Sequence, residues 1–162
     1  MKKTFFLFFL SIIISGTQAQ DLHAHWKQEI KKVNASEYDL IFTVKIDPGW
    51  HIYSMVKATQ PDGPNPTMIE FKKTADYEMV AKTKESKPIE EDDKVFEMKV
   101  HYFVGSATFT TRIKLNKTTV IKGTYECQIC SDEACIFPPA EKFEFKIGPS
   151  KGIRLRLIKP TK

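Results

Sequence analysis

Tyr38-Asp-Leu-Ile-Phe-Thr-Val-Lys-Ile46 and Ala107-Thr-Phe-Thr-Thr-Arg-Ile-Lys-Leu115 decide the expected fold, because mostly apolar residues occupy every second position in both segments. This period of two is typical of a β-strand that buries one face and exposes the other. The pattern recurs along most of the chain, and no long stretch has helical periodicity. We expect strands over residues 26–33, 38–46, 50–55, 67–71, 77–82, 96–104, 107–115, 118–129 and 142–147.

Turn residues separate these segments at short intervals. The clearest are Asp47-Pro-Gly49, Pro61-Asp-Gly-Pro-Asn-Pro66 and Val104-Gly-Ser106. Short strands divided in this way predict an all-β, immunoglobulin-like antiparallel β-sandwich. We expect loops over residues 60–66 and 84–94, the second of which is dense in charge. A disulfide between the sheets, as in antibody domains, is excluded because all cysteines lie in one local segment.

The N-terminus has the pattern of an export signal. Lys2 and Lys3 precede an apolar run over residues 4–14, and the small residues Thr17 and Ala19 follow it. We expect a cleaved signal peptide over residues 1–19. The apolar run is shorter than the roughly 20 residues that cross a bilayer.

The rest of the chain is expected to form one domain over residues 20–148 and a basic C-terminal tail over residues 149–162. Within the tail, Gly152-Ile-Arg-Leu-Arg-Leu-Ile-Lys159 alternates apolar and basic residues, which indicates an additional solvated strand more than a membrane contact. The formal net charge is +5, but the basic residues are scattered among acidic ones. Without an Arg-rich face, binding to nucleic acid is not expected.

Three cysteines lie within nine residues, at Cys127, Cys130 and Cys135. Along the preceding strand, alternation places Cys127 on the apolar face with Tyr125, and Cys130 on the other face with Gln128. We therefore predict that Cys127 is a small buried hydrophobe. Cys130 and Cys135 flank the polar turn at residues 131–134, where a hairpin would bring them together.

The residues alone leave three functions open for this cluster. An inert disulfide is one, although so short a loop contributes only about 2 kcal/mol in the chain-entropy account. A pair of thiols held ready for exchange is another. A metal site is a third, weaker possibility, with C-x2-C-x4-C spacing and a histidine as fourth ligand, from among His23, His25, His51 and His101. The opposed strand faces argue against it, and we expect neither metal nor cofactor.

Several motifs together resemble one family. They are Gly49-Trp-His-Ile-Tyr-Ser54, Gly63-Pro-Asn-Pro-Thr67, His101-Tyr-Phe103, Gly123-Thr-Tyr-Glu126, Cys130-Ser-Asp-Glu-Ala-Cys135 and Pro138-Pro139. The chain resembles the N-terminal periplasmic domain of the thiol:disulfide interchange protein DsbD from about Trp26 to Ile147. The resemblance implies an immunoglobulin-like fold with a redox-active disulfide near the tip of a hairpin.

Residue by residue, the resemblance implies that Cys135 forms mixed disulfides with partners and that Cys130 resolves them. Val95 and Phe96 correspond to a cap loop over the pair. Tyr53 and His51 correspond to positions that lie close to it. Cys127 stands where relatives carry an apolar or aromatic residue, in agreement with the buried position predicted from alternation.

The implied activity is periplasmic protein-disulfide reduction by thiol–disulfide exchange. In the family, electrons come from a membrane thiol reductase through a thioredoxin-like domain, and pass to thioredoxin-fold or cytochrome c maturation proteins. The sequence stops at Lys162 without those donor parts, so we expect the donor to be a separate protein. The competing hypothesis is a non-catalytic binding module with a structural disulfide.

Overall fold

The structure is a computed structural model that describes residues 22–94 and 96–148. Within those residues it contains strands and no helix. The strands are β1 (Ala24–Lys32), β2 (Glu37–Ile46), β3 (His51–Tyr53), β4 (Met68–Phe71), β5 (Tyr77–Met79), β6 (Lys84–Glu85), β7 (Ile89–Asp93), β8 (Met98–Val104), β9 (Ser106–Leu115), β10 (Thr119–Glu126), β11 (Ile129–Cys130), β12 (Cys135–Ile136) and β13 (Glu141–Ile147).

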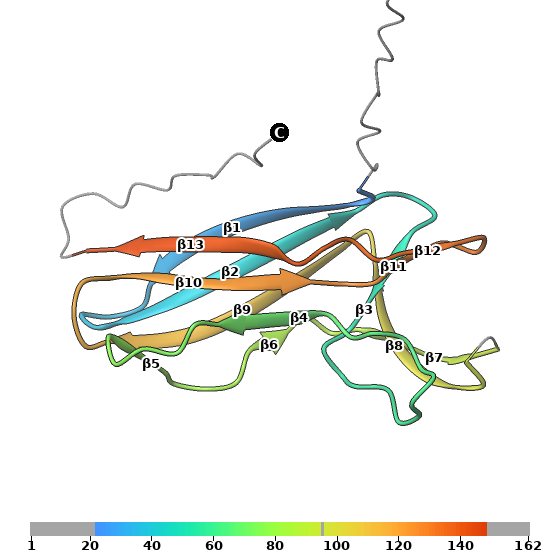
Figure 1. Cartoon of the computed structure of the whole chain (residues 1–162), viewed down its shortest axis with the longest axis horizontal. Coiled ribbons are helices and arrows are strands. Elements are labelled where there is room, and N and C mark those ends of the chain that lie inside the picture. The colour runs from blue at the N-terminus through green and yellow to red at the C-terminus, as the bar shows by residue number, and fades with distance from the viewer. Residues whose placement is uncertain (1–21, 95, 149–162) are drawn as a thin grey trace, which may run out of the picture.

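The strands form three antiparallel sheets. The first has the order β1-β2-β9-β5, with β6 also paired to β9, and the second has the order β13-β10-β4. The third has the order β12-β11-β3-β8-β7. Figure 1 shows the long strands of the first two sheets as stacked layers, with the β11–β12 and β7–β8 hairpins at one end of the molecule. The prediction of an all-β, immunoglobulin-like antiparallel sandwich is confirmed.

Aromatic rings fill the space between the first two sheets. Phe42 of β2 is fully buried, and its ring centroid lies 5.0 Å from that of Phe143 and 5.5 Å from that of Phe145 on β13. Trp26 of β1 reaches Tyr125 of β10, with 4.7 Å between ring centroids. Each buried aromatic side chain contributes about 1.5–3 kcal/mol to the stability of the fold, because its apolar surface is removed from water. This main core confirms the buried faces predicted for residues 38–46 and 107–115.

Two glycines in predicted turns have a backbone that other residues rarely adopt. Gly49 (φ 81°) precedes β3, and Gly105 (φ 69°) joins β8 to β9. Positive φ costs glycine little because it has no Cβ. Gly105 lets the chain leave the third sheet and enter the first within a single residue.

The strand predicted over residues 118–129 is interrupted. β10 ends at Glu126 and pairs with β13 and β4, whereas β11 begins at Ile129 and pairs with β3 and β12. The chain therefore changes sheet across Cys127 and Gln128. Gln128 and Cys130, which alternation placed on a polar face, are both buried. The alternating pattern did not reveal the break, because residues on both faces of the strand are buried at this point.

The segment predicted as a charged loop over residues 84–94 contains β6 and β7. β7 is the outermost strand of the third sheet and pairs only with β8 among the described strands. An edge strand can keep acidic side chains in water, and such charges discourage pairing with other chains. The low hydrophobicity of Glu90, Glu91 and Asp92 therefore did not prevent strand formation. Two other predicted strands are shorter than expected, at β3 and β5.

Substitution of Gly123 tests whether the second sheet is closely packed at this position. A Cβ at this position would overlap the backbone oxygen of Glu70 and the ring of Phe143. We expect Gly123→Ala to lower the free energy of unfolding by about 3 kcal/mol, since overpacking forces backbone shifts. The measurement is urea unfolding. Gly148→Ala is the control, because the nearest atom to its Cβ is the Thr118 methyl carbon at 3.7 Å. Equal urea midpoints for the two variants would contradict this packing.

Candidate functional site

The third sheet buries residues on both faces. Ile52 of β3, Phe103 of β8 and Ile129 of β11 point into the main core. Their neighbours Tyr53 and Cys130 point to the opposite side, because successive strand residues alternate. There they form a second cluster, defined here as Tyr53, Met98, Val100 and Cys130, with Ala58, Phe96 and Tyr102 packed against it. Cys130 is thus held on a rigid strand and is separated from the main core.

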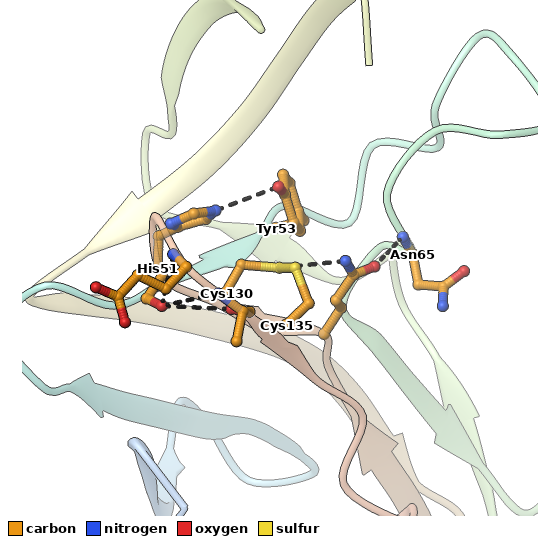
Figure 2. Close-up of a disulfide and its surroundings, with 9 residues drawn as sticks. His51, Tyr53, Asn65, Cys130 and Cys135 are labelled. Carbon is orange, nitrogen blue, oxygen red and sulfur yellow. Dashed lines mark hydrogen bonds between the residues drawn. A yellow bond between two sulfur atoms is a disulfide. The ribbon is translucent and has the colours of Figure 1, made fainter. Parts of the chain in front are cut away.

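The β11–β12 hairpin joins the two predicted cysteines. Cys130 and Cys135 are direct cross-strand partners with 4.1 Å between their Cα atoms, and a disulfide links them (Figure 2). This separation is close to the ~4.5 Å of non-hydrogen-bonded antiparallel pairs. The Ser131 N–H donates to the Ala134 backbone oxygen at 2.8 Å, and the Ser131 hydroxyl accepts from the Glu133 and Ala134 N–H groups. Serine thus organises the turn.

The two sulfur-bearing residues differ in exposure. Cys130 is 2% exposed, whereas Cys135 is an exposed residue. A thiolate approaching from solvent therefore reaches Cys135 first. The geometry gives the disulfide one accessible and one enclosed end.

Gln128 contacts the enclosed sulfur, and the sequence did not identify it as a site residue. It is 5% exposed, and its Nε2 donates to Cys130 Sγ at 3.2 Å. Its Oε1 accepts from the backbone N–H of Asn65 at 2.7 Å (Figure 2). The available signal was the i, i+2 spacing, which predicted that Gln128 and Cys130 share a face. Nothing in the sequence indicated the contact with a loop 63 positions away.

His51 and Tyr53 lie on β3 beside the disulfide. His51 is the cross-strand partner of Cys130, and its Nε2 lies 3.2 Å from the Tyr53 hydroxyl. Burial raises the pKa of Tyr53 to about 12, so the phenol stays protonated at neutral pH. Burial also lowers the pKa of His51, with partial compensation from Asp132 and Asp93. The sulfur pair therefore lies beside two largely neutral polar rings.

Phe96 lies in the turn of the β7–β8 hairpin. It is half-buried, its ring is edge-on to Tyr53 with 6.1 Å between centroids, and it packs against the second cluster. Its backbone N–H donates to Asp93 Oδ1 at 3.0 Å. The following residue, Glu97, has φ 50°, a left-handed backbone that costs a non-glycine residue roughly 1 kcal/mol. Val95, the other predicted cap residue, lies outside the described residues.

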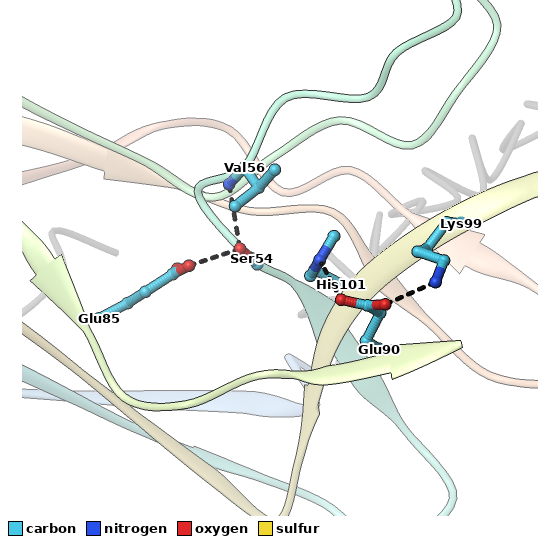
Figure 3. A network of polar contacts seen from close by, with 6 residues as sticks. All are labelled: Ser54, Val56, Glu85, Glu90, Lys99 and His101. Carbon is cyan, nitrogen blue, oxygen red and sulfur yellow. Dashed lines mark hydrogen bonds and ion pairs between the residues drawn. The ribbon is translucent and has the colours of Figure 1, made fainter. Parts of the chain in front are cut away.

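Polar contacts fix the end of β3. The Ser54 hydroxyl donates to Glu85 Oε1 at 2.6 Å and accepts from the Val56 N–H at 3.0 Å (Figure 3). Ser54 is fully buried, so these bonds satisfy a hydroxyl that would otherwise be costly to enclose. They hold the chain that carries Tyr53 against β6.

A second set of contacts in Figure 3 joins β7 to β8. Glu90 accepts from Lys99 Nζ at 2.6 Å, and its other oxygen lies 3.2 Å from His101 Nε2. Both contacts are solvent-exposed and contribute modestly to stability. Their role is to align the strand pair that carries Phe96.

Comparison with known proteins identifies the family. A family model described as "Thiol:disulfide interchange protein DsbD, N-terminal" matches residues 19–147. The chain belongs to this family. A search of curated proteins finds no match.

Solved structures that resemble this chain share little sequence identity with it. The N-terminal periplasmic domain of ScsB from Proteus mirabilis is 16% identical with a TM-score of 0.58, over 80% of this chain and 49% of that one. This chain thus spans about half the length of the ScsB structure, and the match supports the fold alone.

Two structures from Neisseria meningitidis are also similar. The reduced DsbD N-terminal domain is 15% identical with a TM-score of 0.45, over 76% of this chain and 84% of that one. The DsbD N-terminal domain in complex with the PilB N-terminal domain is 14% identical with a TM-score of 0.47, over 80% and 89%.

The third cysteine of this DsbD-type domain is part of the main core. Cys127 is 8% exposed, which confirms the predicted burial. Burial raises the pKa of its thiol to about 12, so the thiol stays protonated at neutral pH. A protonated, enclosed thiol is a poor nucleophile, and Cys127 is therefore suited to packing.

The metal site considered from the sequence would need cysteines and a histidine close together. Within the described residues, the structure contains no group of three or more His, Cys, Asp or Glu side chains arranged to hold a metal ion. His23 and His25 both contact Asp47, at 3.1 and 2.9 Å. His101 contacts Glu90 instead of a cysteine. The histidine near the disulfide is His51.

No helix long and apolar enough to cross a bilayer is found in residues 22–94 and 96–148.

Proposed function

We propose that this domain performs thiol–disulfide exchange in the periplasm and passes electrons to oxidised partner proteins through Cys130 and Cys135. The observation that carries the proposal is the asymmetric disulfide, with Cys135 exposed and Cys130 enclosed. Membership of the DsbD N-terminal family supports it. A cleaved signal peptide over residues 1–19 would bring the domain to that compartment.

The exchange follows from the exposure of the two sulfurs. In the reduced domain, the Cys135 thiolate attacks a partner disulfide, forms a mixed disulfide and releases one partner thiolate. The Cys130 thiolate then attacks Cys135 Sγ, which restores the Cys130–Cys135 bond and releases the second partner thiolate. Two electrons pass to the partner, and the released thiolates take protons from solvent. The net activity is protein-disulfide reduction.

Local charge keeps the resting dithiol unreactive. The turn between the cysteines contains the exposed acids Asp132 and Glu133 and no Lys or Arg. Negative charge nearby and burial both disfavour a thiolate. A reduced pair that is slow to react on its own is suited to an oxidising compartment, where exposed thiols are lost to oxidants.

Phe96, together with Val95, acts in this proposal as a cap over the pair. Phe96 already packs against the cluster that contains Cys130 and meets Tyr53. A partner that displaces the β7–β8 turn would open the cluster around Cys130, which Phe96 shields in the resting domain. His51 and Tyr53 lie on β3 beside Cys130.

If Phe96 acts as a cap, its removal should change the rate at which a small reductant reduces the disulfide. Phe96→Ala should speed reduction by dithiothreitol severalfold, because the ring no longer shields the second cluster. Phe137→Ala is the matched control: this phenylalanine is 61% exposed, follows Cys135 by two residues and is absent from the second cluster. The measurement is the rate of dithiol formation under excess reductant. Equal rates for wild type and both variants would remove the cap from the mechanism.

The proposed partners follow from family membership. The electron donor is a thioredoxin-like domain or membrane thiol reductase, and the acceptors are thioredoxin-fold proteins or cytochrome c maturation proteins. Cys135, the exposed residue of the pair, is the point at which such partners would attach covalently.

Trapping in cells tests the proposed function. Cys130→Ala should accumulate mixed disulfides between Cys135 and partner proteins, because the resolving thiol is missing and the Cys127 thiol is buried. Cys135→Ala should form none, because the two remaining thiols, at positions 127 and 130, are both buried. The measurement is non-reducing electrophoresis after acid quenching, followed by mass spectrometry of the adducts.

Cys127→Ala is the control for nonspecific thiol chemistry and should accumulate no adducts, because its exchanging pair is intact. Absence of adducts in Cys130→Ala, with the variant folded and exported, would contradict the proposed function. So would adducts of equal yield in Cys135→Ala.

A further inference from the structure

The enclosed end of the disulfide has a specific hydrogen-bond donor. Of the residues that the structure describes, Gln128 is the one whose side chain donates to Cys130 Sγ, at 3.2 Å. The amide and the sulfur are both nearly inaccessible to water, at 5% and 2% residue exposure. Water is therefore poorly placed to solvate charge at this sulfur.

The orientation of the Gln128 amide is fixed by its other contact. The backbone N–H of Asn65 can only donate, and it lies 2.7 Å from Oε1. A flipped amide would place its NH₂ group against that N–H, with two donors facing each other. The NH₂ group must therefore face the sulfur. Asn65 belongs to the loop before Thr67, which is held by a hydrogen bond from the Thr67 N–H to the Ser54 backbone oxygen at 3.1 Å.

A donor at this position matters only when charge develops on Cys130. A neutral disulfide sulfur is a weak acceptor, whereas a thiolate is a strong one, and hydrogen bonds to charged groups are stronger than those to neutral groups. An enclosed thiolate without a donor would be costly. The contact is therefore worth most in the step that breaks the disulfide.

We infer that Gln128 stabilises the thiolate that Cys130 becomes, and so makes Cys130 the leaving group when a dithiol donor reduces the domain. This inference rests on the proposed function and deepens it, because it assigns the chemistry of the enclosed sulfur.

A donor thiolate attacks Cys135 Sγ and forms a new S–S bond, while the Cys130–Cys135 bond breaks and its electron pair moves to Cys130 Sγ. The Gln128 N–H holds that charge until solvent supplies a proton. The second donor thiolate then attacks the donor sulfur of the mixed disulfide and releases Cys135. The donor leaves as a disulfide, and the domain holds two reduced cysteines.

Other titratable groups surround the pair from each packed element. His51 and Tyr53 are contributed by β3, Tyr102 by β8, Asp93 by the end of β7 and Asp132 by the β11–β12 turn. The two acids raise the cost of negative charge on sulfur. Gln128 acts against them.

Substitution of Gln128 tests the inference through both rate and pH dependence. Gln128→Met removes the donor at similar side-chain volume and should slow reduction by dithiothreitol about tenfold. It should also raise the pKa of Cys130 in the reduced domain, measured from the ¹³Cβ chemical shift of labelled cysteine. Gln60→Met is the matched control, an exposed glutamine of the same region, and should leave both values unchanged.

Two further measurements separate donation from a merely structural role. Gln128→Glu keeps an oxygen to accept from Asn65, and at pH 8, with the carboxylate ionised, it should be at least as slow as Gln128→Met, because it lacks the donor and adds negative charge beside the sulfur. In the wild-type domain, the side-chain amide protons of Gln128 should shift with the same midpoint as the Cys130 ¹³Cβ signal. Amide protons that do not respond to that titration would overturn the inference, even if both variants failed to fold.

The outcomes distinguish this inference from the proposed function. Wild-type rates in both folded Gln128 variants, together with partner trapping by Cys130→Ala, would overturn the role of Gln128 and leave the exchange function intact. Slow reduction in both variants supports Gln128, whether or not trapping identifies protein partners.

Discussion

Packing of Ile52, Phe103 and Ile129 into the main core fixes the side of the sheet on which the disulfide lies. Because strand residues alternate, seating Ile129 in the core forces Cys130 to the opposite face. The same alternation on β3 places Tyr53 next to it. The site is therefore positioned by hydrophobic burial on the far side of its own strands. No dedicated polar scaffold is needed to place the sulfur, only a correct register between β3 and β11.

The consequence of that placement is a disulfide with chemically unequal ends. Cys135 lies on an edge strand and is exposed to solvent, whereas Cys130 is enclosed by a small cluster against which Phe96 packs. Enclosure alone would make Cys130 a poor thiolate. The buried amide of Gln128 offsets this, and it is itself fixed by a backbone N–H from a distant loop. Access, shielding and charge stabilisation thus come from three different segments that the fold brings together.

The sequence predicts the local parts of this arrangement well. The apolar alternation of residues 38–46 and 107–115 identified the buried faces of β2 and β9, and Gly105 marked a turn between sheets. Cys127 was predicted to be buried because it continues the apolar face of Tyr125. A prediction of this kind succeeds when one local physical cause, such as periodicity or turn chemistry, decides the outcome.

Features that depend on distant contacts were not predicted. The break between β10 and β11 was missed because Cys127, Gln128 and Ile129 are all buried, so burial does not change where the chain moves from one sheet to the other. The strand β7 was missed because its acidic residues are tolerated only at a sheet edge. Gln128 was missed because a single glutamine has no distinctive pattern, and its partner Asn65 is adjacent only in the folded chain.

The most direct test of the account is the reduction potential of the Cys130–Cys135 disulfide, measured by equilibrating the folded domain with dithiol–disulfide buffers. Structural disulfides lie below about −300 mV, whereas exchange proteins lie between about −270 and −120 mV. The account predicts a value in the exchange range, with reversible interconversion and no loss of fold. A value below about −300 mV, or unfolding upon reduction, would show that the disulfide is an inert crosslink in a binding domain.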